Sequence, residues 1–259
     1  MKVRYRVLGS FELLVGDRIC TPSAPKVRQL LAHLLMNPNQ IVPIDSIIEE
    51  LWGDRPPASA VTTTQTYVYQ LRRLLVREGV SSDGEDLVMT RAPGYMIRTE
   101  PDEIDAELFH ELAAQAQRHL GHGRAAEASE SAARALALWS GPAMSNVTLG
   151  TKLEACAVRL EEQRLRVNEL RIEAEMSLGR HRDLISDLRS LVVRHPLNEW
   201  FHAQLILALQ RSGRRSEALQ AYRSLRALLS RELGVEPSDE LQVLHRAVLD
   251  GSSSALLSA

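Results

Sequence analysis

Side chains able to bind nucleic acid are gathered on one face of a predicted helix over residues 59–77, SAVTTTQTYVYQLRRLLVR. With 3.6 residues per turn, the opposite face is apolar or small and consists of Ala60, Thr64, Val68, Leu71 and Leu75. The outer face carries hydroxyl, amide and guanidinium groups and no carboxylate, at Thr62, Thr63, Gln65, Thr66, Tyr69, Gln70, Arg72 and Arg73. Such groups donate to phosphate oxygens and read base edges in a major groove. A merely solvated helix usually mixes Glu and Lys on its outside, so the pattern favours contact with DNA.

The elements around this helix must position it. Three short alternating runs at 3–8, 11–15 and 18–20 predict an antiparallel sheet, and two apolar-faced helices follow at 26–36 and 43–52. A β-hairpin around Ala92-Pro93-Gly94 comes after the polar helix. Three helices with a polar third one, followed by a hairpin, are the layout of a winged helix-turn-helix. Residues 1–100 therefore predict an α+β winged-helix DNA-binding domain.

The second half of the chain reads as all helix from Pro101-Asp102 onward. Two helices at 107–120 and 124–139 precede a long one at 149–178, and two hairpins follow at 181–211 and 215–249. The pair Gly179-Arg180 recurs as Gly213-Arg214, a spacing of 34 residues, which is the tetratricopeptide period. We therefore expect an all-α tetratricopeptide-like domain over 101–250 that offers a surface to proteins or peptides, and a disordered tail over 251–259.

Composition sets further limits. The net charge of −2 predicts weak binding to random DNA, so affinity must depend on specific contacts or on dimerisation. There is no run of about 18 apolar residues and no signal-peptide pattern, which predicts a cytoplasmic protein without a membrane partner. Two distant cysteines argue against a disulfide framework or a metal cage, and we expect reduced, buried or half-buried thiols.

Catalytic chemistry finds little support in the residues. His119 and His122 could hold a metal, but no third ligand is near in sequence, so we expect exposed histidines. The glycines sit at turns and form no phosphate-cradling loop. We expect no enzyme activity, no cofactor and no metal. Trp52, between a helix and Gly53, could pack in the core or donate its indole N–H to a phosphate.

These segments together resemble the small form of the streptomycete antibiotic regulatory protein family, over almost the full length. The family's OmpR-type winged-helix domain is similar to TPSAPKVRQLLAHLL, ELWGDRPP, TTTQTYVYQLRRLL and RAPGYMI. Its bacterial transcriptional activation domain is similar to IDAELFHELAAQAQRHL, ALALWSGPA and RSGRRSEALQAYRSLRALLSRELGVEPSDELQVLHRAVL. The resemblance implies a nucleoid-associated, pathway-specific activator of a secondary-metabolite (antibiotic) gene cluster. It would bind direct repeats in double-stranded promoter DNA near the −35 region and recruit RNA polymerase holoenzyme through sigma and other subunits.

The resemblance also assigns roles by position. It places Thr62, Thr63, Thr66 and Gln70 toward the bases, Arg72 and Arg73 on phosphates, Trp52 beside the DNA backbone and Arg91 at the wing tip near the minor groove. Gln70 stands where several response regulators have Arg, so adenine is the expected partner there. Two protomers would bind in tandem on direct repeats. The alternative is a protein-binding adaptor in which the helical-repeat domain is the functional part and the winged helix binds protein instead of DNA.

Overall fold

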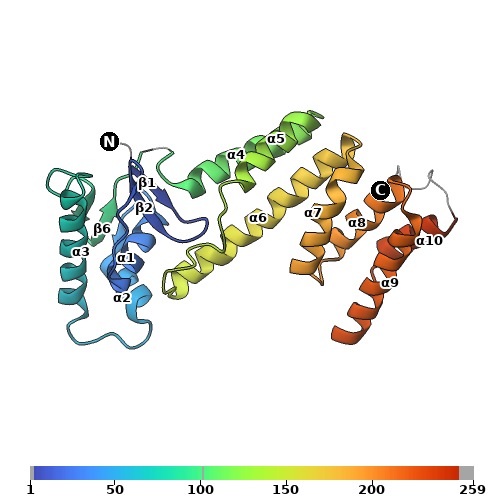
Figure 1. The fold of residues 1–259 in the computed structure, drawn as a ribbon. Helices are drawn as coiled ribbons and strands as arrows, with labels where there is room; N and C mark the ends of the chain where they lie inside the picture. Colours follow the sequence, from blue (N-terminus) through green and yellow to red (C-terminus); the bar gives the residue numbers. More distant parts are fainter. Residues whose placement is uncertain (1–2, 101, 251–259) are drawn as a thin grey trace. The chain divides into compact units, whose positions relative to one another are not determined.

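The computed structural model describes residues 3–100 and 102–250, which form two compact units (Figure 1). One unit holds the described residues up to Arg118 together with Glu130–Glu169. The other holds His119–Ser129 together with the described residues from Leu170 onward. Pro101, where the sequence places a domain boundary, and the expected disordered tail over 251–259 lie outside the described residues.

The first unit opens with the expected antiparallel sheet. Its strands are β1 (Val3–Arg6), β2 (Glu12–Val15) and β3 (Arg18–Ile19), in the order β1-β2-β3. Alternation along β1 buries Val3 and Tyr5 and turns the arginines between and after them outward. The sequence prediction of three short strands is confirmed.

A winged helix-turn-helix follows, as predicted. Its helices are α1 (Pro25–Leu35), α2 (Ile44–Trp52) and α3 (Ala60–Arg77), and its wing is formed by β5 (Val88–Arg91) and β6 (Gly94–Ile97). A further two-residue strand, β4 (Val42–Pro43), pairs with β6 and gives the sheet order β4-β6-β5. Gly94 is required at this crossing because a Cβ there would lie 1.9 Å from the carbonyl oxygen of Val42.

The chain then forms α4 (Asp105–Gly121), α5 (Ala125–Leu136) and α6 (Thr151–Ser177). Within the first unit, Trp139 is buried, with its ring centroid 5.5 Å from that of Phe109 in an edge-on arrangement. The guanidinium carbon of Arg164 lies 4.5 Å from the Trp139 ring centroid. Trp139 is therefore a packing residue, as its aromatic type predicts.

The second unit contains the helical hairpins α7 (His181–Arg194) with α8 (Glu199–Arg211) and α9 (Arg215–Glu232) with α10 (Asp239–Asp250). Consecutive helices pack on one another, and α10 also contacts α8. The repeated Gly-Arg pair closes a helix each time: Gly179 and Gly213 have φ of 73° and 78°. The amides of Arg180 and Arg214 donate to the carbonyls of Glu175 and Leu209 at 3.0 and 2.8 Å. The 34-residue spacing thus marks the same helix-ending turn twice.

Other expectations have mixed outcomes. Cys20 and Cys156 are half-buried free thiols, as predicted. His122 is exposed, but His119 is half-buried, which differs from the expectation. Within residues 3–100 and 102–250, no helix combines the length and apolar character of a membrane span, and no group of three or more His, Cys, Asp or Glu side chains could hold a metal ion.

Candidate nucleic-acid interface

The buried face of α3 is the one that the sequence predicts. Ala60, Thr64, Val68, Leu71 and Leu75 are its buried residues, and the helix packs on α1 and α2. The opposite face lies at the outer edge of the unit, with α1 and β6 on the inner side of α3 (Figure 1). Of the predicted base-facing residues, Thr62, Thr66 and Gln70 are exposed and Thr63 is half-buried.

Two threonine hydroxyls of this face, those of Thr63 and Thr66, have partners within the chain. Thr66 Oγ1 donates to the carbonyl of Thr62 at 3.0 Å, and the hydroxyls of Ser59 and Thr63 lie 3.3 Å apart. The hydroxyl proton of Thr66 is therefore used within the helix, although the side chain is exposed. A hydroxyl bonded in this way is a better acceptor than donor toward a base edge.

Arg72 is oriented toward the wing. Its Nε and Nη2 donate to the carbonyl of Val88 at 2.9 and 2.6 Å, and Nη2 also donates to Thr90 Oγ1 at 2.9 Å. Nη1 lies 2.9 Å from Glu85 Oε1, and the side chain is only 15% exposed. These contacts use the guanidinium within the chain, so a phosphate role at Arg72 gains no support from the geometry. The side chain ties the third helix to the wing.

Arg73 and Arg91 are the exposed cations of the predicted set. The guanidinium carbon of Arg73 lies 5.9 Å from the centroid of the Tyr69 ring, a cation–π contact between residues four apart on α3. Arg91 ends β5 and stands opposite Gly94, which places it at the tip of the wing as expected. Both guanidinium groups remain accessible to a phosphate.

Trp52 is half-buried at the C-terminal end of α2. Its ring is stacked on that of Tyr67, with centroids 6.2 Å apart and an angle of 22° between the planes. Packing is therefore one of its roles, and a phosphate contact through the indole N–H stays a prediction. The sequence gives no sign of this pair, because the two residues lie on different helices.

A buried carboxylate supports the helix-turn-helix from behind. Glu50 on α2 is 2% exposed and accepts hydrogen bonds from the amides of Gly150, Lys152 and Leu153 at 2.7, 2.9 and 3.1 Å. Gln29 Nε2 donates to the same carboxylate at 3.1 Å and to the Glu50 carbonyl at 2.8 Å. The start of α6 is therefore capped by a residue of α2.

Two further side chains join the N-terminal sheet to later segments of the same unit. Asp105 accepts hydrogen bonds from the amides of Val7 and Leu8 at 2.8 and 3.2 Å, and burial raises the pKa of its carboxyl to about 6. Asn146 forms a reciprocal pair with the backbone of Phe11, at 2.7 and 3.2 Å. Sequence reasoning missed all three supports, since each looks like an ordinary polar residue.

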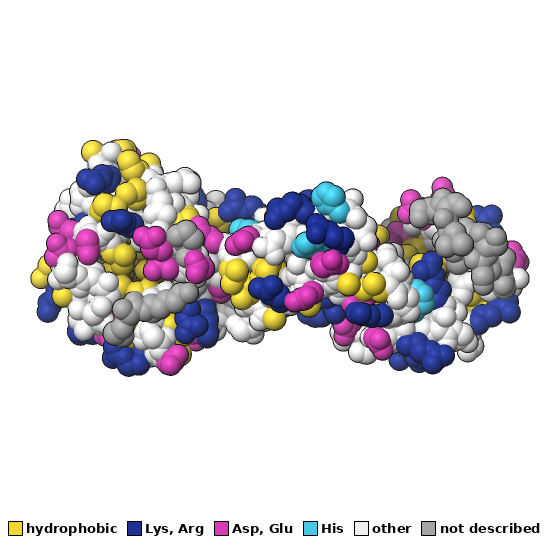
Figure 2. Space-filling model, turned by 90° about the horizontal axis from the view of Figure 1, so that it is seen from above, with side chains coloured by type: hydrophobic (Ala, Val, Ile, Leu, Met, Phe, Trp, Pro, Cys, Tyr) yellow, Lys and Arg dark blue, Asp and Glu magenta, His cyan; other side chains and the backbone are white. Residues whose placement is uncertain are grey.

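The basic side chains of α3 do not belong to a large basic surface. On the face shown in Figure 2, basic and acidic side chains of the described residues are interspersed rather than gathered into one basic surface. An open hollow of about 980 Å³ runs along the outer side of α3, lined from three segments by Ser23, Thr66, Tyr69, Gln70, Arg72, Arg73, Leu74, Val76, Arg77, Asp83 and Glu85. Its two carboxylates, Asp83 and Glu85, lie in the loop after the helix, so within this hollow the favourable sites for phosphate are on α3.

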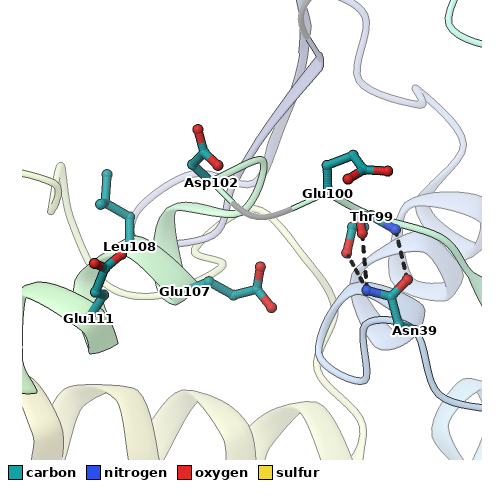
Figure 3. A pocket seen from close by; sticks show the side chains of 7 residues that line it. All are labelled: Asn39, Thr99, Glu100, Asp102, Glu107, Leu108 and Glu111. Atoms are coloured by element: carbon teal, nitrogen blue, oxygen red, sulfur yellow. Dashed lines mark hydrogen bonds between the residues drawn. The ribbon is translucent and has the colours of Figure 1, made fainter.

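A second pocket, of about 480 Å³, is lined mostly by acidic side chains (Figure 3). Asn39 and Thr99 close one wall: Asn39 Nδ2 donates to the Thr99 carbonyl at 3.0 Å, and the Thr99 amide donates to Asn39 Oδ1 at 3.1 Å. The remaining lining is mostly acidic and consists of Glu100, Asp102, Glu107, Leu108 and Glu111. These carboxylates would repel a phosphate backbone. This leaves the outer face of α3 and the wing as the candidate interface.

Comparison with known proteins agrees with this arrangement. Residues 104–249 match the bacterial transcriptional activator domain, and residues 21–97 match the C-terminal domain of transcriptional regulatory proteins. The regulatory protein DnrI of Streptomyces peucetius is 43% identical over 232 residues, covering 88% of this chain and 85% of DnrI. The chain belongs to the streptomycete antibiotic regulatory protein family. It is a transcription regulator with an activator domain.

Other relatives of this streptomycete antibiotic regulatory protein are longer. The regulatory protein AfsR of Streptomyces griseus is 35% identical over 95% of the chain, which spans only 24% of AfsR. The solved structure of Mycobacterium tuberculosis EmbR in complex with a low affinity phosphopeptide matches with a TM-score of 0.88 and 30% identity. That match covers 96% of this chain and 65% of EmbR.

Proposed function

We propose that the chain binds promoter DNA through the outer face of α3, with the wing beside it, and activates transcription from that site. The observation that carries the proposal is the exposed, carboxylate-free outer face of α3 in a regulator of this family. Thr62, Thr63 and Thr66 face the bases, and Gln70 pairs with adenine through its amide. The hydroxyl contacts described above make Thr66 an acceptor or an apolar contact.

The cations divide into two kinds in this proposal. Arg73 and Arg91 are exposed, so their guanidinium groups can contact DNA. In the proposal, Arg73 contacts a phosphate from α3, and Arg91 reaches the minor groove from the wing tip. Trp52 lies beside the DNA backbone while stacked on Tyr67. Arg72 instead fixes the wing against the helix. Phosphate contacts provide most of the affinity, and each base contact discriminates by about 1–3 kcal/mol.

Membership of the family supports the wider part of the proposal. Two protomers bind direct repeats near the −35 region in tandem and recruit RNA polymerase holoenzyme to a secondary-metabolite (antibiotic) gene cluster. Such a protein works in the cytoplasm, on the nucleoid. Repeats about one helical turn apart would bring both third helices to one face of the DNA.

A footprint of the full chain on the promoters flanking its own gene tests the proposal. We expect two or three protected direct repeats about one helical turn apart, upstream of the −35 element. Arg73→Ala should weaken the protection. Arg159→Ala, which removes an exposed guanidinium from α6, should leave it unchanged. Absence of protection by folded wild-type protein at modest salt would contradict a DNA-reading function.

The helical hairpins α7–α10 keep the adaptor function as a second candidate, since stacked helix pairs provide binding surfaces for proteins. The two functions differ in what the third helix does. A DNA reader would lose its activity in the cell when Gln70 and Arg73 are both replaced by alanine. An adaptor would keep it, because neither side chain belongs to the hairpin array.

A further inference from the structure

The centre of the outer face of α3 is a row of side chains defined by helix geometry. At about 100° per residue, positions 62, 66, 69 and 73 fall within about 40° of the direction opposite the buried face. Position 70 lies about 60° from that direction, and position 72 lies about 100° from it. A helix that enters a major groove along this direction presents Tyr69 to the DNA more directly than Gln70.

Tyr69 is an exposed aromatic residue on an otherwise polar surface. Its side chain is 59% exposed, whereas Tyr67, two residues earlier, is half-buried and stacked on Trp52. Tyr69 lies between Thr66 and Arg73 in the row. The Thr66 hydroxyl is bonded to the carbonyl of Thr62, and the guanidinium carbon of Arg73 lies 5.9 Å from the centroid of the Tyr69 ring. The row therefore contains one exposed aromatic ring with a cation next to it.

The matching feature of DNA is the C5-methyl group of thymine, which is the apolar group displayed in the major groove. Covering an exposed ring with a methyl group removes apolar surface of both partners from water. Arg73, held against the ring, would reach a phosphate next to the same base. We infer that Tyr69 is a specificity-determining residue that contacts a thymine methyl group in the major groove, an inference that rests on the proposed function.

Deoxyuridine provides the test, since it differs from thymidine only by lacking this methyl group. Duplexes are first selected from a randomised pool with the full wild-type chain, and their thymines are then replaced by deoxyuridine one at a time. Fluorescence anisotropy measures the affinity of each duplex. For wild type, we expect binding to weaken about fourfold when deoxyuridine replaces thymidine at one position in each direct repeat, the factor for one buried methyl group.

The variants assign that loss to a residue. Tyr69→Ala should bind the thymine duplex more weakly and show no further loss with deoxyuridine, and Tyr69→Gln should behave in the same way if the alanine variant folds poorly. Tyr69→Phe keeps the ring and should keep the fourfold sensitivity. Val61→Ala is the matched control, because Val61 is 48% exposed on the same helix but lies about 120° from the centre of the row.

The outcomes separate this inference from the function beneath it. If the wild-type chain selects no sequence from the pool, the proposed DNA-reading function fails. If it selects a sequence but no thymine is sensitive to loss of its methyl group, the assignment of Tyr69 is wrong and the proposed function stands. The same holds if Tyr69→Ala and Tyr69→Gln retain the wild-type sensitivity.

Discussion

Replacing Glu50 by alanine tests whether the winged helix and the beginning of α6 are stable only together. The carboxylate is buried on α2 and accepts three backbone N–H groups from Gly150, Lys152 and Leu153, as well as the amide of Gln29. Alanine removes the acceptor for all four donors. The amide of Leu153 is left in a buried site and those of Gly150 and Lys152 in half-buried sites, whereas Gln29 keeps its bond to the backbone carbonyl of residue 50.

The expected loss follows from the number of donors. An unsatisfied buried donor costs about 1–3 kcal/mol, and burial of the carboxylate itself offsets part of what the bonds contribute. We therefore expect Glu50→Ala to lower the free energy of unfolding by about 3–5 kcal/mol, the lower part of the sum over the three backbone donors. Glu50→Gln keeps one oxygen as an acceptor but turns an NH2 group toward the amides, and should cost about half as much.

Urea unfolding followed by far-ultraviolet circular dichroism measures this loss, and hydrogen exchange at residues 150–153 localises it. Glu49→Ala is the control: Glu49 Oε2 lies 3.0 Å from Lys152 Nζ, but the carboxylate is 52% exposed. A surface pair of this kind contributes about 1 kcal/mol or less. Equal effects of Glu49→Ala and Glu50→Ala, or a change below about 0.5 kcal/mol for both, would refute the reasoning.

Three further predictions concern DNA binding and pH. Arg73→Ala should weaken binding to all duplexes and reduce the slope of log K against log salt by about 1. Gln70→Ala should instead lose about 1–3 kcal/mol of discrimination at one base position. Equal losses on specific and random DNA for both variants would contradict these roles. Arg72→Ala should lower the affinity for DNA without changing the salt slope. It should also speed hydrogen exchange in β5, because the Arg72 guanidinium donates to the Val88 carbonyl and to the Thr90 hydroxyl. Unchanged hydrogen exchange in β5 together with a smaller salt slope would instead indicate a phosphate contact. Burial raises the pKa of Asp105 to about 6. An unfolded aspartate has a pKa of about 3.9, so the folded chain binds the proton more tightly and stability should fall as pH rises from about 4 to about 6. At about 1.4 kcal/mol per pKa unit, this contribution to the free energy of unfolding reaches about 3 kcal/mol. Asp105→Asn should remove the pH dependence, measured by urea unfolding at pH 4 to 7. The same pH dependence in the wild type and the variant would contradict the raised pKa of Asp105.

Sequence reasoning succeeds where one element carries its own signal. The spacing of Ala60, Thr64, Val68, Leu71 and Leu75 is a property of a single helix, so the buried face of α3 follows from periodicity alone. The repeated Gly-Arg turn is equally local, because a glycine with positive φ ends each helix whatever packs around it. Fold class and most element boundaries follow from such signals.

It fails where a partner far along the chain decides the role of a side chain. In the sequence, Arg72 has the spacing of a cation on the outer face of the helix. Its hydrogen bond to Val88 and its ion pair with Glu85 exist only when the wing packs against α3. Glu50 reads as a surface acid until the start of α6 reaches it. The strand β4 has only two residues, too few to show alternation, and its pairing with β6 is a tertiary contact.

The contact between Glu50 and the start of α6 has a consequence for protein engineering. Consider a chimaera that exchanges winged-helix domains between relatives through a junction directly after the wing, near residue 100. Such a junction places Glu50 and the amides that its carboxylate caps on opposite sides of the junction, so that they come from different proteins. It also separates Phe11 from Asn146. A graft that includes residues up to about Glu169 would transfer the winged-helix domain with its own support.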